Sequence, residues 1–255
     1  MIELGGGCLV IFSHDASTLR EGTRESRTII GVHVRAHDIA QTESFFDRGI
    51  SPGRLNPSSE EVHYVLEGAG ACYIDGYCYP VEPGSAAYVP AGSVCCFEHD
   101  GPGRLRVVSV CCPEALDAQM GLPPQTAPRD VAQPPPRRVV HERERDPIPT
   151  GIRTFKLLAD TDLGCQRVTQ FLGVIPPSEA EPHYHTYEEA IYILEGSGTF
   201  WAEGREAPIG PGTCIYLPRR VWHATRNRGT APIRLIGVFH PSGSPAAAYM
   251  DREHA

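Results

Sequence analysis

The sequence predicts an all-β protein made of two tandem antiparallel β-barrels of the jelly-roll type. Three observations predict this fold class. The 255-residue chain contains one internal repeat, its 26 glycines and 24 prolines divide it into short segments, and several of those segments are apolar runs of strand length. Hydrophobic residues make up 41% of the chain, which is typical of a folded globular protein.

The internal repeat is the strongest of these indications. Adding 128 to the numbers of residues 60–95 leads to residues 188–223 without a gap, and many positions are identical. The identical turn-forming residues include Gly68/Gly196, Gly70/Gly198, Gly76/Gly204, Pro83/Pro211, Gly84/Gly212 and Pro90/Pro218. Further identical pairs are Glu60/Glu188, Glu61/Glu189, Tyr64/Tyr192, Arg106/Arg234 and Pro113/Pro241. Because glycine and proline determine turn geometry, both halves are expected to follow one backbone path.

Apolar runs bounded by glycine and proline predict the strands of the second half. They lie at residues 168–175, 190–194, 199–203, 214–217 and 233–239. Short helices are expected near residues 114–120 and 246–252. The proline-rich stretch 113–149 is typical of an extended linker. The predicted division is therefore an N-terminal barrel at 1–112, this linker, and a C-terminal barrel at 150–255.

The charge and the cysteine content limit the classes of partner. The net charge is -8 and no basic stripe is present, which disfavours nucleic acid and anionic membranes and leaves a small-molecule substrate. No apolar stretch is long enough to span a bilayer. The nine cysteines include two adjacent pairs, so reduced thiols in the cytoplasm are expected. The oligomeric state is left open between a monomer and a homodimer.

Three histidines and one glutamate in the second half have the spacing of a metal site. His183 and His185 are two residues apart, so on a strand both imidazoles point to one face. Glu189 keeps the same parity, and His223 follows the strand that Pro218 ends. This mixed nitrogen and oxygen set suits one transition-metal ion, Fe, Mn, Ni, Cu or Zn, in preference to Ca or Mg. Four protein ligands on an octahedral ion leave two positions for a substrate or O2.

At these residues the sequence resembles the cupin superfamily. Its first motif, His-x-His-x3-Glu-x6-Gly, is matched by His183, His185, Glu189 and Gly196. Its second motif, Gly-x5-Pro-x-Gly-x2-His-x3-Asn, is matched by Gly212, Pro218, Arg220, His223 and Asn227, with Arg220 in place of a glycine. The glycine that usually opens the first motif is Pro177 here. The resemblance covers both halves and implies a bicupin, with cupin domains in tandem and the metal in the C-terminal one.

The N-terminal half is expected to have lost its metal site. The positions that correspond to the four ligands are Leu55, Pro57, Glu61 and Cys95, and only the glutamate is retained. Leucine and proline cannot bind a metal, so a set of three histidines and a glutamate is excluded there. A makeshift site from Glu61, His63 and Cys95 is the disfavoured alternative. The expected role of this half is to complete the core.

Several residues near the ligands are candidates for substrate chemistry. Glu189 and Arg220 are the candidate catalytic residues, and other side chains considered for an anionic or carbonyl substrate are Arg167, Gln170 and Arg219. From their parity, Tyr184 and Tyr187 are expected to stack outside the barrel and Glu188 to have a structural role.

Three classes of function fit the predicted site. The favoured class is an O2-dependent oxidoreductase, since the ligand set resembles that of quercetin-dioxygenase-type cupins. The second is a non-redox isomerase, decarboxylase or aminohydrolase that uses the metal as a Lewis acid. The third is a non-catalytic small-molecule-binding protein, which an intact metal set disfavours. The superfamily hosts many reactions, so the motif does not select among these classes.

Overall fold

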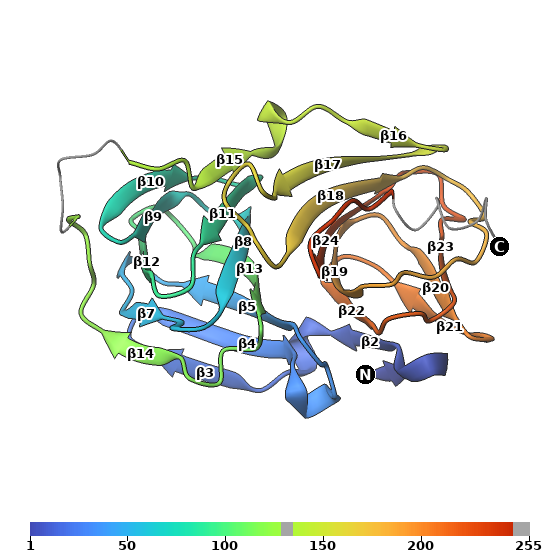
Figure 1. Cartoon of the computed structure of the whole chain (residues 1–255), viewed down its shortest axis with the longest axis horizontal. Helices are drawn as coiled ribbons and strands as arrows, with labels where there is room; N and C mark the ends of the chain where they lie inside the picture. Colours follow the sequence, from blue (N-terminus) through green and yellow to red (C-terminus); the bar gives the residue numbers. More distant parts are fainter. Residues whose placement is uncertain (129–134, 247–255) are drawn as a thin grey trace.

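The computed structural model describes residues 1–128 and 135–246, and it is almost entirely β-structure. Two barrels lie side by side, the N-terminal one built mainly of the blue to green strands and the C-terminal one of the yellow to red strands (Figure 1). The all-β fold class is confirmed, and all five strands expected in the second half are present. In the described part of the chain, no helix is long and apolar enough to cross a membrane.

The N-terminal barrel consists of a seven-stranded and a six-stranded sheet. The larger sheet has the order β15-β11-β8-β13-β5-β4-β3, and the smaller has β10-β9-β12-β7-β14 with β6 beside β12. The strands of these sheets are β3 (Thr18–Glu21), β4 (Arg24–Ile30), β5 (Ala40–Phe46), β6 (Gly49–Ile50), β7 (Gly53–Leu55), β8 (Glu60–Glu67), β9 (Gly70–Ile74), β10 (Tyr77–Val81), β11 (Ser85–Val89), β12 (Val94–His99), β13 (Leu105–Cys112), β14 (Gln119–Leu122) and β15 (Val139–His141).

The C-terminal barrel consists of an eight-stranded sheet, β1-β2-β22-β19-β24-β18-β17-β16, and a three-stranded sheet, β21-β20-β23. All the strand pairs are antiparallel. The strands are β1 (Ile2–Glu3), β2 (Leu9–Phe12), β16 (Ile148–Thr150), β17 (Arg153–Ala159), β18 (Thr169–Ile175), β19 (Glu188–Glu195), β20 (Gly198–Ala202), β21 (Arg205–Ile209), β22 (Thr213–Leu217), β23 (His223–Arg226) and β24 (Ile233–His240).

Segments from both ends of the first half cross the expected domain boundaries. Strand β2 pairs with β22, so the first residues of the chain extend the C-terminal sheet. Strand β15, from the expected linker, pairs with β11 of the N-terminal barrel, and β14 pairs with β7. Each added strand supplies hydrogen-bond partners to a sheet edge that would otherwise be open. Parts of the expected linker therefore belong to the sheets of the fold.

The helices of the structure are single turns. They are the 3-10 segments η1 (Gly5–Gly7), η2 (Ser13–Asp15), η3 (Val32–Val34) and η4 (Glu142–Glu144). The helix expected near residues 114–120 is wrong, since strand β14 begins at Gln119 and no helix lies there. The one expected at 246–252 falls, apart from Ala246, outside the described residues.

Turn geometry explains why glycines recur in the repeat. Gly68 and Gly196 follow β8 and β19 with φ of 75° and 79°, a left-handed conformation that side chains other than glycine rarely adopt. A Cβ at Gly68 would lie 2.6 Å from the carbonyl oxygen of Arg104, and one at Gly196 would lie 2.5 Å from that of Pro232. The two halves therefore need glycine at the same turn for the same reason.

Apolar side chains form three buried clusters. The largest lies between the two big sheets and contains residues of both halves, such as Val62, Tyr64, Ala190 and Ile236. The other two fill the C-terminal and the N-terminal barrel separately. The interface between the barrels is thus a hydrophobic core in its own right, and it holds the barrels in one orientation.

Two glutamates at equivalent positions of the repeat, Glu60 and Glu188, hydrogen-bond across this interface. The carboxylate of Glu60 accepts backbone N–H groups of Gln166, Arg167 and Val168 at 2.6–3.1 Å. The carboxylate of Glu188 likewise accepts N–H groups of the N-terminal half, those of residues 37 and 38, both at 2.8 Å. Each barrel therefore holds a loop of the other through a buried glutamate. The structural role expected for Glu188 fits this contact.

We expect Glu60→Ala to lower the free energy of unfolding by roughly 2–4 kcal/mol, because three N–H groups at the interface lose their acceptor. Glu67→Ala is the matched control on the same strand, where the carboxylate is 65% exposed and pairs with Arg106. Its loss should stay below about 1 kcal/mol. Denaturant unfolding measures both values, and equal losses would contradict the role given to Glu60.

Candidate metal centre

Two backbone segments bring the three predicted histidine ligands together. His183 and His223 form an isolated bridge, in which each backbone N–H donates to the other's carbonyl at 3.0 and 2.8 Å. His185 follows two residues later, and one ring nitrogen of each of the three histidines lies within 4.8 Å of the others. Glu189 is the second residue of β19 and lines the same cavity. All four side chains are buried.

Backbone carbonyls orient two of the three imidazoles. Nδ1 of His223 lies 2.9 Å from the carbonyl oxygen of Val221, and Nδ1 of His183 lies 3.3 Å from that of Glu181. A carbonyl can only accept, so Nδ1 carries the proton in both rings. The lone pair of each neutral imidazole is then on Nε2, the atom available to a ligand. Burial, followed by the neighbouring His185 and His183, holds the pKa of His223 well below its usual value, which keeps this ring neutral.

The remaining two side chains carry polar atoms without a partner. His185 Nδ1 and Glu189 Oε2 lie 3.0 Å apart, yet within the described residues neither atom makes a hydrogen bond of proper geometry. Both atoms can bind a metal, and both side chains line one cavity together with the two oriented imidazoles. The donor set therefore fits a cation between these residues.

A largely apolar cavity of about 90 Å³ opens beside the four side chains. Its apolar lining includes Phe155, Phe171, Ile175, Ile191, Phe200 and Leu235. The polar lining apart from the ligand set comes mainly from Thr150, Thr154, Thr225 and the half-buried Arg153, whose Nη2 donates to the Thr225 carbonyl at 3.1 Å. A ligand in this cavity would meet one cation and otherwise mostly apolar or neutral groups.

The arginine at this cavity is not the one that the motif indicated. Arg220 is exposed and does not line the cavity. Its φ of 62° is the left-handed conformation that the motif glycine would adopt, and its backbone N–H donates to the His185 carbonyl at 2.6 Å. The turn directs the side chain outward, so the expectation that Arg220 touches the substrate is corrected. Arg153 has the better position.

The other considered side chains also lie away from the cavity. Arg219 is exposed and pairs with Asp38 at 2.6 Å, and Arg167 is exposed. Gln170 is buried on β18 but is absent from the cavity lining. None of these three side chains lines the cavity beside the predicted ligands, where a substrate-binding residue would have to lie.

The two tyrosines beside the ligands differ in position. Tyr184 packs edge-on against Trp222, whose side chain is partly exposed. This contact lies at the surface, as expected for Tyr184. Tyr187, in contrast, is buried and lines the cavity, with its ring 4.2 Å from that of Phe239. The bend at residues 186–187 interrupts the strand alternation, so parity could not place Tyr187.

In the N-terminal barrel an arginine side chain occupies the position that corresponds to the proposed metal ion. Glu61, which corresponds to Glu189, is buried and forms an ion pair with Arg54 and a 3.1 Å hydrogen bond with Asn56. Among the residues that the structure describes, His63 and Cys95 belong to no group of three close ligating atoms. The makeshift metal site therefore lacks the required geometry.

A second group of ligating atoms, formed by His37, Asp38 and Glu188, has another explanation. The Glu188 oxygens already accept two backbone N–H groups across the interface. The imidazole of His37 is 84% exposed and pairs with Asp38 at 3.1 Å. These contacts belong to the interface between the barrels.

Gly237 on β24 leaves room for the glutamate ligand. A Cβ there would lie 2.8 Å from Glu189 Oε1 and 2.3 Å from Cε1 of Phe171. We expect Gly237→Ala to destabilise the fold by roughly 1–3 kcal/mol through overpacking. Gly210→Ala, whose added Cβ would meet nothing within 4 Å, should change stability by less than about 0.5 kcal/mol. Thermal unfolding compares the two, and an unaffected Gly237→Ala variant would refute the crowding.

Sequence relatives match parts of the chain. Quercetin 2,3-dioxygenase of Bacillus subtilis is 28% identical over 110 residues, which is 40% of this chain but only 31% of that protein. The tetracenomycin polyketide synthase protein TcmJ of Streptomyces glaucescens is 28% identical over 108 residues, 40% of this chain and 71% of the relative. Gentisate 1,2-dioxygenase of a Ralstonia species is 26% identical over 119 residues, 44% of this chain and 33% of the relative.

Solved structures match nearly the whole chain. Oxalate decarboxylase from Bacillus subtilis, determined at pH 4.6, superposes with a TM-score of 0.76 over 96% of this chain and 78% of its own, at 15% sequence identity. At this identity the likeness establishes the fold alone. The family model of the cupin domain matches residues 48–111 and 171–239, one segment in each barrel and together just over half of the chain. The chain therefore belongs to the cupin superfamily and is a bicupin.

Proposed function

We propose that the C-terminal barrel binds one transition-metal ion through His183, His185, Glu189 and His223 and catalyses an O2-dependent oxidation of a small organic substrate. The observation that carries the metal site is the pair of buried, unpartnered atoms on His185 and Glu189, 3.0 Å apart beside two oriented imidazoles. A transition metal held there would supply Lewis acidity and, if redox-active, electron transfer to O2.

The cavity lining supports a substrate with an apolar, planar body and one anionic or enolic group. Phe155, Phe171 and Phe200 offer aromatic surface to the body, and Arg153 offers the single cation to the negative group. A small, strongly polar diacid would leave most of its oxygens against apolar walls, which is unfavourable. Two sequence relatives are named as dioxygenases of aromatic compounds, in keeping with this substrate class.

The chain's own residues would contribute binding and orientation. Arg153, tied to the Thr225 carbonyl, would position the anionic group of the substrate. The apolar walls would exclude water from the reacting atoms. Glu189 would act mainly as a ligand, and its carboxylate would be the group beside the substrate able to hold or pass a proton.

The metal content tests the ligand assignment. The wild-type protein should contain one transition-metal ion per chain, and His183→Ala or Glu189→Ala should lose at least about tenfold in metal affinity. His63→Ala, in the other barrel, is the matched control and should keep full occupancy. Elemental analysis of the purified variants measures this. Metal retained in His183→Ala and lost in His63→Ala would show that the ion lies in the N-terminal barrel and would contradict the assignment.

Oxygen uptake tests the reaction class. With quercetin or gentisate as probes of aromatic enols and hydroxy acids, the metal-loaded protein should consume O2, and turnover should stop under anaerobic conditions. Turnover that is indifferent to O2 would instead support the non-redox class of isomerases and decarboxylases. An electrode measurement with product analysis separates the two results.

Substitution of the cavity arginine tests the substrate class. Arg153→Ala should weaken binding of an anionic substrate by about tenfold to a hundredfold in KM with the metal retained, because one charge-assisted hydrogen bond is lost. Arg220→Ala, an exposed arginine two residues from Trp222, should leave KM within about twofold. Steady-state kinetics measure both, and the reverse result would restore the motif-based assignment of Arg220.

A further inference from the structure

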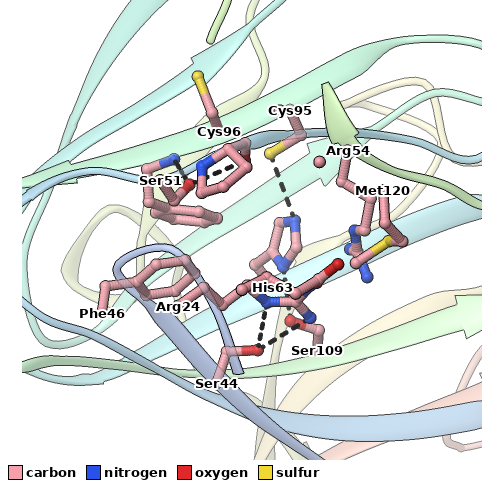
Figure 2. Close-up of a pocket in the computed structure, with 15 residues that line it drawn as sticks. Arg24, Ser44, Phe46, Ser51, Arg54, His63, Cys95, Cys96, Ser109 and Met120 are labelled. Atoms are coloured by element: carbon pink, nitrogen blue, oxygen red, sulfur yellow. Dashed lines mark hydrogen bonds and ion pairs between the residues drawn. The ribbon is translucent and has the colours of Figure 1, made fainter. Parts of the chain in front are cut away.

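The interior of the N-terminal barrel contains a thiol group that the metal chemistry does not use. Cys95 lies on β12 at the position that corresponds to the ligand His223, and it is buried. Its sulfur points toward the ring of His63, with Sγ 3.9 Å from Nε2 (Figure 2). On the neighbouring strand β9, Sγ of Cys72 lies 3.8 Å from Sγ of Cys95. The Cys95 sulfur therefore has a second thiol on one strand and an imidazole on another as close neighbours.

Two arginines line the cavity beside Cys95. Arg24 comes from β4 and donates through Nε and Nη2 to Oγ of Ser44 (Figure 2). Arg54 comes from β7 and pairs with Glu61. Both side chains are largely buried, at 11% and 17% exposure. The cavity measures about 20 Å³. That volume admits a molecule about the size of water. Hydrogen peroxide is only slightly larger than water, whereas bulky electrophiles are far too large.

These surroundings distinguish Cys95 from the cysteines around it. The contact with Cys72, together with Arg54 and Arg24, lowers the pKa of Cys95, although burial acts in the opposite direction. Burial raises the pKa of Cys96 to about 11, and its side chain points away from His63 (Figure 2). Burial, followed by the two arginines, keeps the pKa of His63 well below its usual value, so its ring stays neutral beside the Cys95 sulfur.

We propose that Cys95 and Cys72 form a peroxide-reactive thiol pair. The Cys95 thiol releases its proton to solvent, and the thiolate attacks one oxygen of hydrogen peroxide. An S–O bond forms, the O–O bond breaks, and hydroxide leaves, so that Cys95 becomes a sulfenic acid. The hydroxide takes up one proton and becomes water. The Cys72 sulfur then loses its proton and attacks the Cys95 sulfur, and the S–O bond breaks as the disulfide forms and a second hydroxide leaves.

The step is balanced without a further reagent. Each hydroxide takes up one of the two thiol protons, so two thiols and one peroxide give one disulfide and two waters. The two thiols are oxidised and the peroxide is reduced. The guanidinium groups of Arg24 and Arg54 stabilise the negative charge on the Cys95 sulfur before the attack. The reaction is independent of the proposed metal site, which lies in the other barrel.

Competition among the nine cysteines tests the proposal in the unmodified protein. The purified chain is treated with a small excess of hydrogen peroxide, the remaining thiols are blocked under denaturing conditions, and each cysteine is followed by peptide mass spectrometry. Accessibility alone predicts that the exposed Cys78 reacts first. The proposal predicts that Cys95 reacts at least about tenfold faster than Cys78 and ends in a disulfide with Cys72. Faster oxidation of Cys78, or no Cys72–Cys95 disulfide, would overturn it.

Variants separate the roles of the two thiols. In Cys72→Ser the disulfide cannot form, and Cys95 should instead gain one or more oxygen atoms. Cys96→Ser, the neighbouring cysteine, is the matched control and should form the Cys72–Cys95 disulfide at the wild-type rate. Arg24→Met should slow the reaction of Cys95 by about tenfold. A Cys95 that stays unoxidised in Cys72→Ser, or an unchanged rate in Arg24→Met, would contradict the roles assigned.

Discussion

Burying polar side chains inside an apolar barrel is the constraint on which the rest of this structure depends. Each buried donor or acceptor left without a partner costs about 1–3 kcal/mol. The C-terminal barrel meets that cost for His183 and His223 with backbone carbonyls, but leaves His185 Nδ1 and Glu189 Oε2 without a hydrogen-bond partner among the described residues. A bound cation resolves that deficit, and the apolar surroundings strengthen its interaction with the ligands.

The N-terminal barrel resolves the same constraint with protein atoms. Its retained Glu61 pairs with the guanidinium of Arg54. The two halves share one backbone path. The C-terminal half uses it for a site suited to a metal, and the N-terminal half uses it to hold an arginine and two thiols. The residues that the halves share are those of turns and of the interface, such as Gly68, Gly196, Glu60 and Glu188. The residues that differ are those at the barrel centres.

Much of this arrangement was predictable from the sequence because it depends on local spacing. The repeat, the strands between glycines and prolines, and the convergence of His183 and His185 all follow from short-range geometry. The pairing of β2 with β22 joins residues about two hundred positions apart, and no local pattern encodes it. Arg153 was missed for a similar reason, since it lies on β17, far from both motifs, and only the closed barrel brings it to the cavity.

Backbone conformation accounts for the errors near the site. Arg220 occupies a glycine position of the motif and adopts φ of 62°, which turns its side chain outward, a direction that spacing cannot reveal. Tyr187 follows a bend that cancels the strand parity. The Tyr187 error comes from treating a bend as an extended strand, whereas Arg220 was placed by its position in the motif alone. Two of the predicted ligands, His183 and His223, are held by paired backbone.

The central claim is that one ion lies among the four C-terminal side chains. Anomalous diffraction from crystals of the metal-loaded protein, collected on both sides of the absorption edge of the bound element, locates that ion directly. We expect one strong peak among His183, His185, Glu189 and His223, and none beside Glu61. A peak in the N-terminal barrel or at the interface group of His37, Asp38 and Glu188, with none at the histidines, would contradict it.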